Sequence, residues 1–121
     1  MIKSILPTVQ AFHSQENEAT WRLFVDANLE YFNGHFPEQA VLPGVTQLDW
    51  AIRLGCEHFG YDAQVATLEV LKFQQLLLPD TEVELAISHN PAKQKLSFIY
   101  SNGEQRFASG RICLASTRGA A

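Results

Sequence analysis

One apolar segment, bounded by a proline and a glycine, constrains the fold of this chain more than any other feature. Between Pro43 and Gly60, apolar residues recur at positions i, i+3, i+4 and i+7, the spacing of one face of an α-helix. Proline is favoured at the start of a helix and glycine just after its end. The face that this spacing predicts to be buried carries Val45, Leu48, Ile52, Gly55 and Phe59. Further apolar residues widen it, so most of the helix should be covered by other elements.

The segments on either side of this helix alternate apolar and polar residues, which is typical of half-buried strands. The apolar members are Trp21, Leu23 and Val25 before the helix, and Val83, Leu85, Ile87, Leu96, Phe98, Tyr100, Ala108, Gly110, Ile112 and Leu114 after it. Asn90-Pro91 marks a turn and Asn102-Gly103 a two-residue hairpin. We therefore expect one or two strands, one helix, and about four more strands joined by tight turns. This is an α+β fold in which an antiparallel sheet wraps around one long helix.

The length and charge of the chain narrow the class of protein. With 121 residues, residues 1–121 should form a single domain, with a frayed tail at 116–121. The net charge of −4 and the lack of a Lys/Arg cluster exclude a typical nucleic-acid binder. No apolar run is long enough to span a membrane, and no signal peptide is recognisable, so we expect a cytoplasmic protein. Cys56 and Cys113 are far apart in the sequence and are expected to be free thiols.

Two side chains are candidates for acid–base chemistry. His35 lies in the unusual segment Gly34-His35-Phe36-Pro37, where prolines and an aromatic residue would fix its position, and histidine exchanges protons near neutral pH. The alternative is an ordinary loop histidine. Asp49 lies in an apolar stretch, where burial favours the protonated carboxyl and so an acid role. The alternative is a solvated stripe with Arg53 and Glu57 at i+4 and i+8.

The start of the predicted helix is a third candidate. The backbone N–H groups of Gly44 and Val45 would be free there, at the positive end of the helix dipole. Such a site suits an oxygen that gains negative charge during a reaction, although an ordinary helix start has the same sequence. The other histidines (His13, His58 and His89) stand in no catalytic or metal-binding motif, and no metal site is expected.

The block Gly34-His35-Phe36-Pro37, followed by Pro43-Gly44-Val45 and Asp49, resembles the signature of the 3-hydroxyacyl-[acyl-carrier-protein] dehydratases. Lys72-Phe73 and Pro79-Asp80 extend the resemblance to a later strand. Within the family, the segment 43–51 looks most like the small dehydratases of aryl polyene biosynthesis. The resemblance implies a hot-dog fold and a dimer with two sites at its interface.

Carried over by position, the resemblance makes His35 the base and Asp49 the acid. The amide of Gly44 would hold the thioester oxygen, with Val45 and Phe36 beside the substrate. No cofactor is implied, because the phosphopantetheine arm belongs to the substrate on its acyl carrier protein. A homodimer is expected, and a heterodimer with a paralogous hot-dog protein is the alternative.

Some positions depart from the family pattern. Glu38 and Ala40 replace a glycine and a proline of the loop, and Arg53 stands where a glutamine is usual. An ion pair between Arg53 and Asp49 would lower the pKa of the acid.

The implied reaction is the dehydration of a 3-hydroxyacyl thioester, in fatty acid or aryl polyene type biosynthesis. Two rival functions remain open, since a fold alone does not define a function. One is an acyl thioesterase, which has no need of the Gly-His-Phe-Pro loop. The other is a non-catalytic partner of an active dehydratase. The acidic chain would also need a local basic patch to dock a carrier, for which Lys72, Lys93, Lys95 and Arg106 are the candidates.

Overall fold

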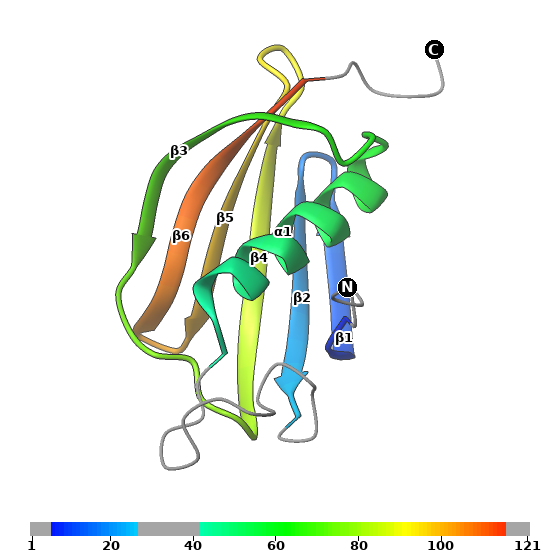
Figure 1. Ribbon diagram of the computed structural model, residues 1–121. Helices are drawn as coiled ribbons and strands as arrows, with labels where there is room; N and C mark the ends of the chain where they lie inside the picture. Colours follow the sequence, from blue (N-terminus) through cyan, green and yellow to red (C-terminus); the bar gives the residue numbers. More distant parts are fainter. Residues whose placement is uncertain (1–5, 27–41, 116–121) are drawn as a thin grey trace.

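The computed structural model describes residues 6–26 and 42–115. They form a six-stranded antiparallel sheet in the order β1-β2-β4-β5-β6-β3, with one helix lying across one of its faces (Figure 1). The elements are β1 (Thr8–Gln15), β2 (Glu18–Val25), α1 (Gly44–Phe59), β3 (Val65–Phe73), β4 (Thr81–Asn90), β5 (Lys95–Asn102) and β6 (Gln105–Leu114). The predicted order of strands, helix and strands is confirmed.

The inner face of the sheet is built by the alternation that the sequence shows. On β4, Val83, Leu85 and Ile87 are buried while their neighbours are partly or fully exposed, and β5 repeats this with Leu96, Phe98 and Tyr100. Side chains on successive residues of a strand point to opposite faces, so these residues all point toward α1. The predicted inward face of β6, from Ala108 to Leu114, is also confirmed.

The helix ends as predicted but presents a different face to the sheet. Gly60 has φ 83°, and its N–H donates to the carbonyl of Cys56, as in a helix end closed by a left-handed glycine. The prediction that Val45 is buried is wrong, because its side chain is 73% exposed. The buried residues are Thr46, Gln47, Trp50, Ala51, Leu54, Gly55, Cys56 and Phe59. Leu48 and Ile52 are only partly buried.

Gly55 sets how closely α1 approaches the sheet. A Cβ atom at this position would lie 3.0 Å from Cδ1 of Ile87 and 3.0 Å from Cδ1 of Leu96. Both side chains are fully buried, so neither has room to move away. The glycine therefore allows a helix–sheet contact that a larger residue would disturb.

The β5–β6 hairpin turn lies one residue later than predicted. Asn102 is the last residue of β5 and pairs with Gln105, so the turn consists of Gly103 and Glu104. Gly103 has φ 62°, a conformation that suits glycine at the first central position of a type II′ turn.

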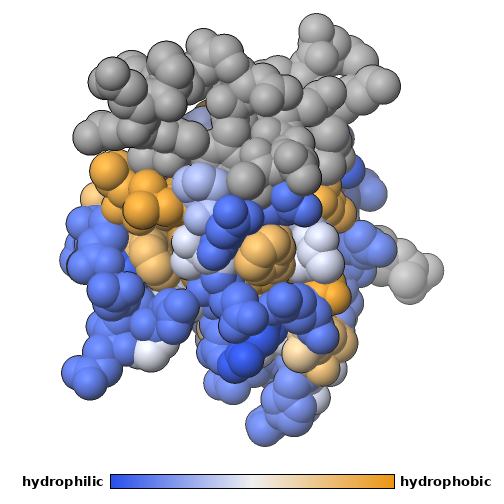
Figure 2. All heavy atoms as spheres, turned by 90° about the horizontal axis from the view of Figure 1, so that it is seen from below, coloured by the Kyte–Doolittle hydropathy of each residue, from blue (hydrophilic) through white to orange (hydrophobic). Residues whose placement is uncertain are grey.

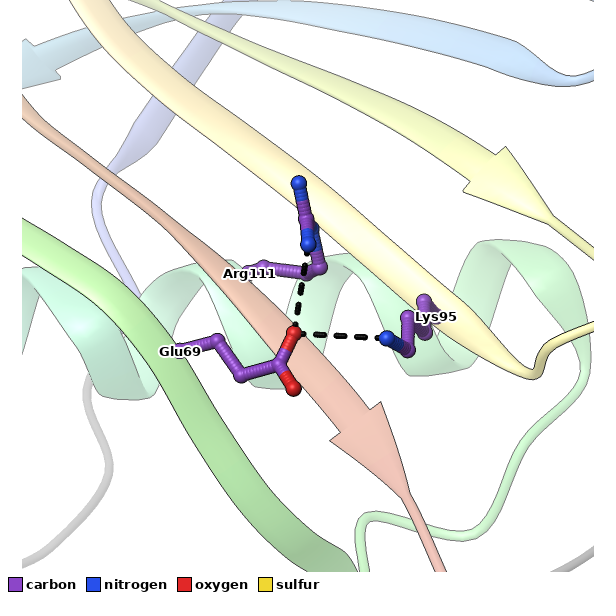
Figure 3. A network of polar contacts seen from close by, with 3 residues as sticks. All are labelled: Glu69, Lys95 and Arg111. Carbon is purple, nitrogen blue, oxygen red and sulfur yellow. Dashed lines mark hydrogen bonds and ion pairs between the residues drawn. The ribbon is translucent and has the colours of Figure 1, made fainter.

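An ion-pair network fastens the edge strand β3 to the sheet. On the face opposite α1, the carboxylate of Glu69 accepts hydrogen bonds from Nζ of Lys95 at 3.3 Å and from Nη1 of Arg111 at 3.2 Å (Figure 3). Hydrogen bonds from Lys95 and then Arg111 hold the pKa of Glu69 below its usual value. The three residues come from β3, β5 and β6, so the network joins three neighbouring strands.

Candidate active site

The first turn of α1 offers free backbone donors. The carbonyl of Pro43 accepts hydrogen bonds from the N–H groups of Thr46 and Gln47, both at 3.1 Å, and no side chain of the described residues caps the helix. Among the described residues, none accepts a hydrogen bond from the amides of Gly44 and Val45. Two free N–H groups at the positive end of a helix suit an oxygen that gains negative charge.

An aromatic ring lies directly over the first residue of this helix. A Cβ atom at Gly44 would be 2.9 Å from Cε1 of Phe73 and 3.1 Å from its Cζ. The Phe73 side chain is half-exposed and comes from the end of β3. Because Gly44 has no side chain, the ring packs against the backbone beside the free amides.

Asp49 lies in the second turn of α1 and is partly buried. The carbonyl of Gln47, two residues before it, accepts a hydrogen bond from the hydroxyl of Tyr100, so this turn of α1 packs against the inner face of β5. Within residues 6–26 and 42–115, no ion pair joins Asp49 to Arg53, whose side chain is exposed. The hypothesis that Arg53 pairs with the acid is therefore not supported by the structure.

The structure describes only some of the other predicted site residues. His35 and Phe36 lie outside the described residues, as does all of segment 27–41. Val45, the second residue of α1, has an exposed side chain. The structure thus brings Gly44, Val45 and Asp49 together on α1 and does not describe the proposed base.

The three remaining histidines lie elsewhere in the fold. His58 packs against the rings of Phe12 and Trp21, with ring centroids 5.3 and 5.9 Å away. His89 is buried, and its Nε2 is hydrogen-bonded to the hydroxyl of Tyr61 at 2.7 Å. His13 lies exposed on β1. None of these three lies on the first two turns of α1.

Three residues that shape this region were not predicted as site residues: Gln47, Phe73 and Tyr100. Of these, Phe73 belongs to the Lys72-Phe73 pair of the family resemblance. The fully buried Tyr100 donates a hydrogen bond from its hydroxyl to the main-chain carbonyl of Gln47, with an O···O distance of 2.6 Å. The signal was present, because a tyrosine on the inward face of a strand needs a partner for its hydroxyl.

Exposed apolar side chains lie along β3 and the segment that follows it, and one of them, Phe73, reaches the helix start. They are Leu68, Val70, Leu71, Phe73, Leu76 and Leu78. In Figure 2, hydrophobic side chains are visible on the left, the side on which β3 lies in Figure 1. An exposed edge strand with apolar side chains is a common site of association with another chain.

Comparisons with known proteins identify the family. The family model described as ApeI-like: ApeI dehydratase matches residues 11–111, which is most of the chain. This chain belongs to the ApeI-like dehydratase family. The sheet and the helix α1 form the hot-dog fold that the sequence resemblance implied.

Two solved structures resemble more than nine tenths of the chain. The dehydratase heterocomplex ApeI:P from Xenorhabdus doucetiae matches with a TM-score of 0.83 and 31% identity, covering 93% of this chain and 100% of the other. An uncharacterised protein from Erwinia carotovora matches with a TM-score of 0.78 and 33% identity, covering 92% and 97%.

A curated relative is more distant and longer. The 3-hydroxyacyl-[acyl-carrier-protein] dehydratase FabZ of Desulfotalea psychrophila is 27% identical over 88 residues, which cover 65% of this chain and 59% of the relative. The match thus spans little more than half the length of that enzyme.

Neither a membrane span nor a metal centre is found in the part of the chain that the structure describes. The helix in these residues, α1, is not long and apolar enough to cross a membrane. In the same residues, no three His, Cys, Asp or Glu side chains are grouped so that they could hold a metal ion.

Proposed function

We propose that this chain removes water from a 3-hydroxyacyl thioester carried on an acyl carrier protein, producing the trans-2-enoyl thioester. The observation that carries this proposal is the placement of a partly buried carboxyl group, Asp49, one turn beyond the free amides of Gly44 and Val45. A donor pair for a thioester oxygen and an acid for a leaving hydroxyl are the two functions that this elimination needs besides a base.

In this reaction His35 takes the proton from C2, next to the thioester carbonyl. The electron pair of the C2–H bond forms the C2–C3 double bond, and the C3–O bond breaks. Asp49 protonates the leaving hydroxyl, so that water departs and the thioester stays intact. Each positioned acid or base typically contributes ~10²–10⁴-fold to the rate. The role of His35 rests on the family resemblance.

The amide of Gly44 would stabilise the negative charge that develops on the thioester oxygen as C2 loses its proton. Removal of one such donor typically costs about 3 kcal/mol of barrier lowering. No cofactor is needed in this scheme, because the thioester itself makes the C2 proton acidic. The phosphopantetheine arm arrives with the substrate.

We also propose that two chains associate through β3 and complete two sites at their interface. No strand of the described residues pairs with the outer edge of β3, and Val70 and Leu76 are 63% and 65% exposed. Burial of these side chains would be favourable at about 25 cal/mol per Å² of apolar surface. This edge lies beside the ring of Phe73 and hence beside the start of α1, so a partner chain docked here would reach the proposed site.

The test of reaction type is mass spectrometry of a panel of 3-hydroxyacyl carrier proteins after incubation with the pure protein. Dehydration lowers the mass of the carrier-bound acyl group by about 18 units and keeps the thioester. Release of the free acid and return of the bare carrier would instead identify a thioesterase. The Asp49→Asn variant is the matched control, because it keeps the shape of the side chain and removes the acid.

A second candidate function is that of an assisting subunit in a heterodimer with an active paralogue. The observation that favours it is the structural match to a dehydratase heterocomplex. The same assay separates the two candidates. Product formed by the purified chain alone, and lost in Asp49→Asn, contradicts the assisting role. Full activity of a reconstituted heterodimer in which this chain carries Asp49→Asn would support it.

A further inference from the structure

One buried hydroxyl links the sheet to the part of α1 that carries Asp49. Tyr100, on β5, has no exposed surface and donates a hydrogen bond to the main-chain carbonyl of Gln47, at 2.6 Å. The phenol of a buried tyrosine needs a partner, because an unpaired polar atom in the interior is costly. Here the partner is a helix carbonyl two residues before Asp49, so the contact fixes the turn on which that carboxyl group stands.

The surroundings of Tyr100 keep its hydroxyl protonated, so that it remains a hydrogen-bond donor. Burial raises the pKa of its phenol well above the usual value, and the nearby charge of Asp49 raises the pKa further. The hydroxyl therefore stays protonated throughout the physiological pH range. Its hydrogen bond to the helix does not depend on pH there.

The side chain of Gln47 extends this link to the start of the helix. Its Nε2 donates to the carbonyl of Leu42 at 3.2 Å, and the N–H of Leu42 donates to the carbonyl of Leu77 at 2.7 Å. Gln47 and Leu42 are both buried. The chain of hydrogen bonds from Tyr100 through Gln47 to Leu42 thus holds the backbone on both sides of Gly44.

We propose that Tyr100 is a positioning residue, which acts through Gln47 to hold Asp49 and the Gly44 amide at a fixed distance from each other and from the sheet. This inference rests on the proposed dehydratase function and deepens it. A misplacement of about 1 Å in a catalytic group can cost ~10²-fold in rate. Loss of the hydroxyl alone should therefore lower kcat at least about tenfold and leave KM nearly unchanged, because Tyr100 is buried and does not touch the substrate.

The test compares Tyr100→Phe with Tyr61→Phe. Each variant loses one buried hydroxyl and one short hydrogen bond, of 2.6 Å in the first case and 2.7 Å in the second. Tyr61 follows the far end of α1 and bonds His89. The thermal midpoint, kcat and KM are measured for both variants on the same 3-hydroxyacyl carrier. We expect similar losses of thermal stability and a fall in kcat only for Tyr100→Phe. Equal kcat values in the two variants would overturn the proposal.

Amide hydrogen exchange gives a readout that needs no substrate. In Tyr100→Phe, exchange should accelerate at residues 48–52 and stay unchanged at residues 56–59, and Tyr61→Phe should not show this pattern. Unchanged exchange at residues 48–52 would sink the inference even if the wild-type chain made no product. An inactive wild-type chain with the expected exchange pattern would count against the proposed function alone. Gln47→Met, which removes the link to Leu42, is a second variant and should lower kcat severalfold.

Discussion

The contact at Gly55 leads to a quantitative prediction about stability. In Gly55→Ala the new methyl group would lie 3.0 Å from Cδ1 of both Ile87 and Leu96, closer than ordinary van der Waals contact. Overpacking of this kind costs about 1–3 kcal/mol, while alanine in place of glycine in a helix gains about 1 kcal/mol. The net loss in the free energy of unfolding should be about 1 kcal/mol, or roughly 4 °C in the thermal midpoint.

A double-mutant cycle isolates the steric contribution to the stability loss of Gly55→Ala. Ile87→Val removes one of the two crowded methyl groups and alone should cost about 0.5–1.5 kcal/mol. Combined with Gly55→Ala, the total loss should be smaller than the sum of the two single losses by about 1 kcal/mol, because the residues are in contact. Urea unfolding measures these free energies. Ile112→Val is the control, since this buried isoleucine is not among the side chains nearest Gly55. Strict additivity with Ile87→Val would refute the reasoning.

Three further predictions concern charge, thiol reactivity and the helix start. Glu69 has a lowered pKa in the folded state, so its stabilising effect is present above the unfolded pKa and is lost as the pH falls through the folded pKa. The difference in urea midpoint between wild type and Glu69→Gln should therefore shrink as the pH is lowered through this range, and also in high salt. Burial, followed by the charge of Asp62, raises the pKa of Cys56 to about 11. At pH 8 about one Cys56 thiol in a thousand is then ionised, so an alkylating reagent should label Cys113 before Cys56. Equal labelling rates of the two cysteines in the folded protein would contradict this. Gly44→Ala must displace the half-exposed ring of Phe73, and the loss in the free energy of unfolding should stay below about 1 kcal/mol. The value of kcat/KM should fall, because the first turn of the helix is disturbed. An unchanged kcat/KM would disprove this.

The sequence predicts the elements of this fold better than it predicts how they face one another. Strand alternation places Leu85 and Phe98 correctly, because a period of two leaves no choice of phase once one face is buried. The helix is apolar around most of its surface, so several phases satisfy its pattern. Packing of Gly55 against the sheet selects one of them and leaves Val45 outside. No spacing within the helix contains that information.

The candidate site was predictable in a different sense. Asp49 and Gly44 follow from local signals, a carboxyl group in an apolar stretch and a helix start, both of which the structure contains. The contacts of Tyr100 and Phe73 with this region join residues that are far apart in the sequence, so they depend on the fold and not on any local motif. His35 follows from the family signature, and its role stays a prediction.

We propose, from the family resemblance, that a dehydratase site is completed by two chains, with His35 from one and Asp49 from the other. His35→Ala and Asp49→Asn proteins are purified, mixed in equal amounts, unfolded and refolded, and the enoyl product is measured by mass against refolded wild type. Each variant alone should be nearly inactive while folded and dimeric. Half the mixed dimers should be hybrids with one intact site, so about a quarter of the wild-type activity should return, as two-fold symmetry requires. A folded, dimeric mixture that stays as inactive as its parents would contradict the shared site, because both residues would then come from one chain.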